Sequence, residues 1–93
     1  MTGKQRRYLR ALGHHLQAVL QVGHEGVSDA LVRAAGEQLE AHELIKVRIL
    51  EGNDRHETAE LLAQKSGAEV AQVLGRTALL YRRRKEKPAI ELP

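Results

Sequence analysis

The tetrad Gly23-His24-Glu25-Gly26 is the segment of this sequence whose residue types and spacing could bind a ligand. It lies between a predicted strand over 18–22 and a predicted helix over 29–42. Glycine carries no Cβ, so the backbone can approach a ligand closely there, and the N–H groups at a helix start attract phosphate. We therefore predict a phosphate-binding loop formed by Gly23, His24 and Gly26. A turn that binds nothing is the alternative interpretation.

Arginine and lysine side chains form the second candidate site. Lys46 and Arg48 alternate with apolar residues on one predicted strand, so both lie on its outer face. The remaining candidates belong to the first predicted helix and to the C-terminal region: Arg6, Arg7, Arg10, Arg76, Arg82, Arg83 and Arg84. The planar guanidinium suits phosphate, so this set is typical of a protein that binds nucleic acid.

Charge is unevenly distributed along the chain. Residues 1–22 carry a net charge of +4, residues 23–75 carry −5, and residues 76–93 carry +4. Two basic ends that meet in space would form one positive surface for a polyanion. We therefore expect the first helix and residues 76–87 to lie on the same side of the molecule as the loop. Basic termini that only keep the protein soluble are the alternative.

Several function classes are excluded or disfavoured by composition. The chain has no Cys, which removes disulfides, thiol catalysis and Cys-ligated zinc. Its five His lack metal-ligand spacing, and no nucleotide-binding glycine motif is complete. With 2% aromatic residues, the chain is poorly suited to stack single-stranded bases. We expect no metal, cofactor, small-molecule substrate or enzymatic activity.

The predicted elements follow the order αβαβαββ within one domain, residues 1–93. Helices are expected over about 3–13, 29–42 and 55–66, with Thr2, Ser28 and Asp54 as N-caps and Gly67 after the last helix. Strands are expected over 18–22, 44–50, 70–74 and 77–82, the last two joined by a two-residue turn at Gly75-Arg76. A basic C-terminal tail begins at about residue 83. No apolar run suggests a membrane span or a signal peptide, so we expect a cytoplasmic protein.

Taken together, these segments resemble the CRM domain, the chloroplast RNA splicing and ribosome maturation module, in its stand-alone bacterial YhbY form. The resemblance covers about residues 4–92. It is carried by Gly23-His24-Glu25-Gly26-Val27-Ser28, Ala41-His42-Glu43-Leu44-Ile45-Lys46-Val47-Arg48, Ser66-Gly67-Ala68, Gln72-Val73-Leu74-Gly75-Arg76 and Leu79-Leu80-Tyr81-Arg82.

The resemblance implies an α+β fold of the two-layer type, with a four-stranded mixed sheet and three helices, similar to the C-terminal domain of bacterial translation initiation factor three. It also implies binding to ribosomal RNA in large-subunit precursors, with the family's functional positions at Gly23, Gly26, Lys46 and Arg82. The loop departs from the family pattern at His24 and Glu25, and a carboxylate repels phosphate at close range. Glu25 is therefore left out of the predicted contacts. We expect a monomer, and a ribosome-associated module that contacts protein rather than RNA is the alternative.

Overall fold

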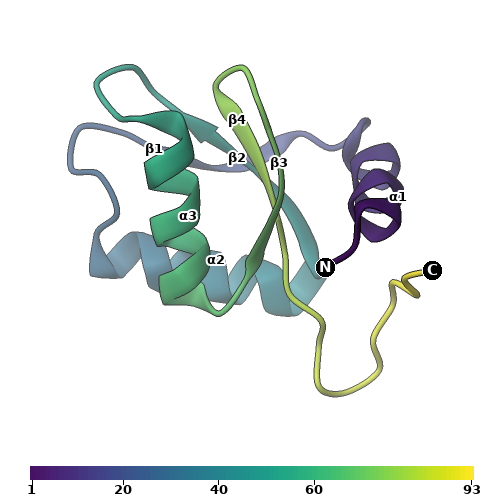
Figure 1. Cartoon of the computed structure of the whole chain (residues 1–93). Coiled ribbons are helices and arrows are strands. Elements are labelled where there is room, and N and C mark those ends of the chain that lie inside the picture. Colours follow the sequence, from purple (N-terminus) through teal and green to yellow (C-terminus); the bar gives the residue numbers. More distant parts are fainter.

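The computed structural model describes residues 1–93 and contains three helices and four strands in the predicted order (Figure 1). The helices are α1 (Gly3–Gly13), α2 (Asp29–His42) and α3 (Arg55–Ser66). The strands are β1 (Ala18–Val22), β2 (Leu44–Ile49), β3 (Glu69–Leu74) and β4 (Thr77–Tyr81). Every observed boundary lies within one residue of the predicted one. None of the helices has the length and apolar character needed to cross a lipid bilayer.

Local capping sets the helix boundaries. The Thr2 hydroxyl accepts a hydrogen bond from the N–H of Gln5, whose side chain accepts one from the N–H of Thr2. Ser28 caps α2 through the N–H of Leu31, and Asp54 caps α3 through the N–H of Glu57. These side chains satisfy N–H groups that a helix leaves free at its start. The three predicted N-caps are confirmed.

The sheet is mixed, with the strand order β1-β2-β4-β3. Strand β1 pairs in parallel with β2, and α2 provides the connection between them. Strands β3 and β4 form an antiparallel hairpin, and β4 also pairs antiparallel with β2. Gly75 has a φ of +57° in the hairpin turn, a conformation that glycine adopts without steric cost.

Helices α2 and α3 cover one face of the sheet. Ile45, Val47 and Ile49 of β2 point into this layer, as their alternation predicted. The main core consists of eleven buried residues: Val22, Ala35, Leu39, Ile45, Val47, Ile49, Ala59, Leu62, Ala63, Ala78 and Leu80. This layer gives the domain its α+β architecture.

The second face of the sheet is covered only in part. Leu9 of α1 packs here in a smaller cluster, with Ile90 and Leu92 of the C-terminal segment against it. Its buried members are Leu9, Leu44, Ala71, Leu79 and Tyr81. Lys46 and Arg48 share this face with Leu44, because alternate residues of a strand point the same way. They lie beyond the part that α1 covers.

The expected position of the basic ends relative to the loop is wrong. Strand β1 begins beside α1 and ends at the loop, and its parallel partner β2 runs in the same direction. Strand β4 runs back, so Tyr81 pairs with Leu44 at the end where β1 begins. Figure 1 accordingly shows α1 and the C-terminus at one end and the segment between β1 and α2 at the other. Arg76 alone of the C-terminal basic residues lies at the loop end, next to Thr77, which pairs with Arg48.

Candidate nucleic-acid interface

The loop between β1 and α2 is a tight turn that leads directly into a helix. The N–H of Gly26 donates to the carbonyl of Gly23 at 3.0 Å, and Gly26 has a φ of +68°. The N–H of Ser28 donates to the carbonyl of Gly26 at 3.1 Å, and Ser28 then caps α2. His24 is exposed at the tip of the turn. The loop thus has the predicted position at a helix N-terminus.

The two glycines of the loop are under different constraints. Gly26 needs its positive φ, which a residue with a Cβ adopts only with strain. Gly23 has no positive φ, and the nearest neighbour that a Cβ would meet is Leu50 Cδ1 at 3.8 Å, an ordinary contact. The fold therefore requires glycine at position 26 but would accept a residue with a Cβ at position 23.

A second loop braces the first. The side-chain amide of Asn53 donates to the carbonyl of Gly23 at 3.0 Å. The Arg76 guanidinium in turn donates to the carbonyls of Ile49 at 2.7 Å, Leu50 at 2.8 Å and Asn53. Arg76 therefore fixes the segment that carries Asn53, and Asn53 fixes the loop.

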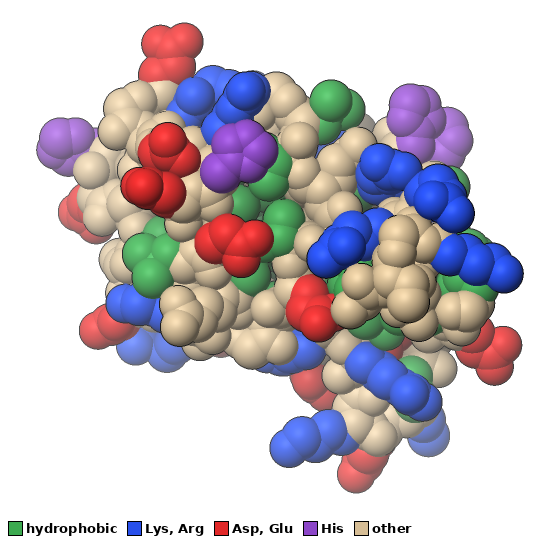
Figure 2. Space-filling model, in the orientation of Figure 1, with side chains coloured by type: hydrophobic (Ala, Val, Ile, Leu, Met, Phe, Trp, Pro, Cys, Tyr) green, Lys and Arg blue, Asp and Glu red, His purple; other side chains and the backbone are tan.

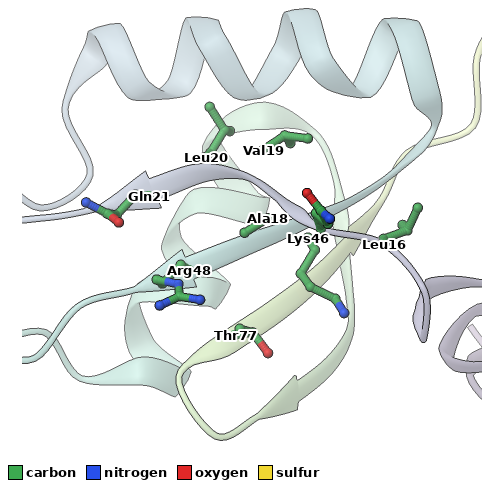
Figure 3. A pocket seen from close by; sticks show the side chains of 9 residues that line it. Leu16, Ala18, Val19, Leu20, Gln21, Lys46, Arg48 and Thr77 are labelled. Atoms are coloured by element: carbon green, nitrogen blue, oxygen red, sulfur yellow. The ribbon is translucent and has the colours of Figure 1, made fainter.

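Lys46, Arg48 and Thr77 lie side by side on the uncovered face of the sheet, whereas Leu20 points toward α2 (Figure 3). Two hollows meet at Lys46 and Thr77, and Arg10 and His14 of the α1 end border the second. No Asp or Glu lines either of them. The first is lined by Leu16, Gln17, Ala18, Val19, Leu20, Gln21, Lys46, Arg48 and Thr77. The second is lined by Arg10, Ala11, Gly13, His14, Lys46, Gln72, Leu74, Thr77 and Leu79.

The predicted cations of α1 are all exposed. Arg6, Arg7 and Arg10 are accessible to solvent, and Figure 2 shows basic side chains over α1 and the C-terminal segment. Acidic side chains gather in the same view over α2 and α3. On the face seen in this view, the α1 end is thus the more basic one.

Besides Arg76, two more of the predicted arginines are engaged within the fold. Arg82 donates to the carbonyls of Ser66 at 2.7 Å and Gly36 at 2.9 Å, and it pairs with Glu40 at 3.5 Å. Arg84 donates to the carbonyls of Glu40 and Ala41 at the end of α2. Cations at helix C-termini complement the helix dipole. Arg83, between them, is exposed.

Glu43 is a buried charge that ties the C-terminal segment to the sheet. Its side chain is 0% exposed and accepts hydrogen bonds from the N–H groups of Arg84, Ala89 and Ile90, at 2.8, 2.7 and 2.8 Å. Burial alone would raise the pKa of this carboxyl. The three N–H donors and the Arg84 charge outweigh burial, so the pKa of Glu43 lies below its ordinary value. The segment after β4 is thus held in place by an ionised carboxylate.

Comparison with known proteins places this geometry in a family. The family model of the CRS1 / YhbY (CRM) domain matches residues 1–82. The chain belongs to the CRM-domain family. This CRM domain is 44% identical over 95 residues to the Bacillus subtilis protein named "Probable RNA-binding protein YqeI", across 100% of this chain and 99% of that one.

Two further relatives extend the comparison. A Methanocaldococcus jannaschii protein, also named a probable RNA-binding protein, is 41% identical over 88 residues, which span 90% of this chain and 65% of that one. A Staphylococcus aureus protein, solved in solution and described as a candidate RNA-binding protein, superimposes with a TM-score of 0.87 at 41% identity, covering 100% and 99% of the two chains. The expected family and α+β fold are confirmed.

The CRM resemblance assigned functional positions to Gly23, Gly26, Lys46 and Arg82. The first three lie at the loop and on the open sheet face, whereas the Arg82 guanidinium joins α2 to the end of α3. Sequence reasoning missed Glu43 and Asn53. Glu43 stands inside the His-Glu-Leu-Ile-Lys-Val run, between His42 and the apolar Leu44, and no local signal marked it. Asn53 stood in a predicted turn, where its residue type needed no further explanation.

Proposed function

We propose that this CRM domain binds RNA through the sugar–phosphate backbone. The observation that carries the proposal is the open sheet face, where Lys46, Arg48 and Arg10 border two hollows without a carboxylate. Within these two hollows, an RNA strand would meet cations and no carboxylate. The names of the relatives, which describe RNA-binding proteins, support the same assignment.

The loop adds backbone donors at one end of this face. Gly23 follows β1, and Arg48 pairs with Gln21 of that strand, so loop and sheet face are adjacent. The fold does not require glycine at position 23. Close approach of a ligand to the backbone would account for glycine there, because glycine has no Cβ. Phosphates would pass from the loop along Arg48 and Lys46 toward the arginines of α1.

The sheet face favours a backbone-reading mode over base stacking. Tyr8 and Tyr81 are the only aromatic residues; Tyr81 is buried and Tyr8 lies on α1. Platforms that bind single strands depend on exposed rings, so structured RNA fits better. We propose ribosomal RNA in cytoplasmic large-subunit precursors as the target and a monomer that acts by binding, without catalysis.

Filter binding to purified large-subunit ribosomal RNA over a salt series tests the proposal. We expect log affinity to fall linearly with log salt, because each phosphate contact releases counterions. Lys46→Ala with Arg48→Ala should reduce the slope by about 2. The matched control is Arg33→Ala with Lys65→Ala, which removes two exposed cations of α2 and α3.

The same assay distinguishes the loop from a plain turn. Gly23→Asp with Gly26→Asp should weaken binding strongly while circular dichroism shows a folded domain. If the double variant binds RNA with wild-type affinity, the loop is a turn that does not contact RNA. Absence of RNA binding by the wild type at low salt, together with retention of protein partners on isolated ribosomal particles, would instead support the protein-interaction alternative.

A further inference from the structure

We infer that Glu43 is a positioning residue that adds the C-terminal segment, residues 83–93, to the RNA interface beside α1. The inference rests on the proposed function, because it extends the surface assigned there. It concerns a residue that is itself buried and negative, so it does not touch RNA. Its effect would come through the segment that it holds.

The Glu43 side chain contacts backbone N–H groups at two places in the C-terminal segment. One carboxylate oxygen accepts from the N–H groups of Ala89 and Ile90, and the other accepts from the N–H of Arg84. The backbone of Glu43 also takes part, because its carbonyl accepts from the N–H of Arg82 at 2.9 Å. Its φ of +62° is strained for a residue with a side chain. Such strain persists where several surrounding contacts fix the residue.

These contacts determine where the segment lies. Ile90 and Leu92 pack against the cluster that contains Leu9 of α1. The side-chain amide of Gln5 donates to the carbonyl of Pro93 at 3.2 Å. Gln5 and Arg83 line one hollow between α1 and the segment. The end of the segment, from Ile90 to Pro93, is therefore packed against the basic helix, whereas the part just after β4 forms a loop that swings away from the body before it returns to α1 (Figure 1).

The segment brings unpaired cations to that place. Arg83, Lys85 and Lys87 are exposed, and none of them forms a salt bridge, since the one salt bridge of the molecule joins Arg82 and Glu40. They outnumber Glu86 and Glu91 of the same segment. Because the end of the segment is fixed at α1, these cations stay on the α1 side of the molecule and enlarge its positive surface. A released segment would have to be ordered again on binding, at a cost in conformational entropy.

Glu43→Gln separates positioning from charge. The substitution makes the domain more positive by one charge, so electrostatics alone would strengthen binding to a polyanion. The amide nitrogen, however, places a donor where Glu43 now accepts from an N–H, and the buried bonds lose their charge assistance. We expect affinity for a labelled hairpin RNA to fall several-fold and the salt slope to fall by about 2.

The matched control is Glu37→Gln on α2, an exposed residue, which changes the net charge equally. Its RNA affinity should equal or slightly exceed that of the wild type. A second variant, Ala89→Pro with Ile90→Pro, removes two of the N–H donors with no change in charge. It should show the same loss of RNA affinity. It replaces Glu43→Gln as the test if that variant does not fold.

Amide exchange measured by NMR provides the structural readout. In Glu43→Gln, the N–H groups of Arg84, Ala89 and Ile90 should lose protection, while those of β2 and β4 keep it. A folded variant with a released segment and undiminished RNA affinity would overturn the inference and leave the proposed function intact. Retained protection of all three N–H groups in Glu43→Gln, with retained protection of the Arg84 N–H in the double proline variant, would also overturn it. Failure of the wild type to bind the RNA would refute the proposed function itself.

Discussion

The side-chain amide of Asn53 donates to the carbonyl of Gly23 at 3.0 Å and joins two loops that are 30 residues apart. Asn53 also makes a weaker contact with the carbonyl of Leu50 at 3.4 Å, within its own loop. Through Arg76, the same loop is attached to the β3–β4 hairpin. The shape of the candidate phosphate loop thus depends on Asn53 and Arg76, which lie outside the loop itself.

Arg76→Lys should therefore loosen the loop although the charge is retained. A lysine ammonium is a point donor and cannot span the carbonyls of Ile49, Leu50 and Asn53 as the guanidinium does. We expect a loss of about 1–2 kcal/mol in the free energy of unfolding, measured by urea denaturation. We also expect faster amide exchange at Gly26. An unchanged exchange rate would show that Arg76 does not brace the loop.

The two loop glycines should respond differently to alanine. Gly26→Ala should destabilise the domain by about 1–2 kcal/mol, because its φ of +68° is unfavourable for a residue with a Cβ. Gly23→Ala should leave stability nearly unchanged, since its Cβ would meet Leu50 Cδ1 at 3.8 Å. Weaker RNA binding by the stable Gly23→Ala variant is the expected result, and equal affinity would count against backbone approach at that position. Denaturation and filter binding on the same samples give both values.

Gly13→Ala should disturb the packing of α1 on the sheet. A Cβ at this position would lie 2.6 and 2.7 Å from the two terminal methyl carbons of Leu79, which is buried. Overpacking of this kind costs about 1–3 kcal/mol, offset in part by the better helix propensity of alanine. Thermal denaturation should show a lower Tm. Gly3→Ala is the control in the same helix, because its Cβ would meet only Arg7 at 3.6 Å.

Acid should weaken the attachment of the C-terminal segment. The pKa of Glu43 is lower in the folded domain than its ordinary value of 4.5. Its contribution to stability is therefore fully present above that value and is lost as pH falls through the folded pKa. The difference in unfolding free energy between the wild type and Glu43→Gln should shrink as pH falls from about 7 to about 3. A difference that stays constant over this range would show that the carboxylate charge does not hold the segment.

Local interactions explain how much of the fold could be predicted. Thr2, Ser28 and Asp54 accept hydrogen bonds from N–H groups three residues away, so a few neighbouring residues are enough to predict these caps. The alternation of β2 likewise identified its buried and open faces. In α1, Leu9 is buried but Leu12, three residues later, is 42% exposed. The helix therefore contacts the sheet along a narrow line, which its sequence alone does not show.

Sequence patterns were sufficient to predict the order of elements, their caps, the Gly-x-x-Gly turn at the start of α2, and the family. The positions of these parts relative to one another follow from long-range contacts in the folded chain. The strand pairing put α1 and the C-terminal segment at the end of the sheet opposite the loop. It also engaged Arg76, Arg82 and Arg84 with backbone carbonyls and buried Glu43 beneath the C-terminal segment. The physical reason is range: caps and alternation act within a few residues, whereas the partner of Glu43 at Ile90 is 47 residues away and is set by the path of the whole chain.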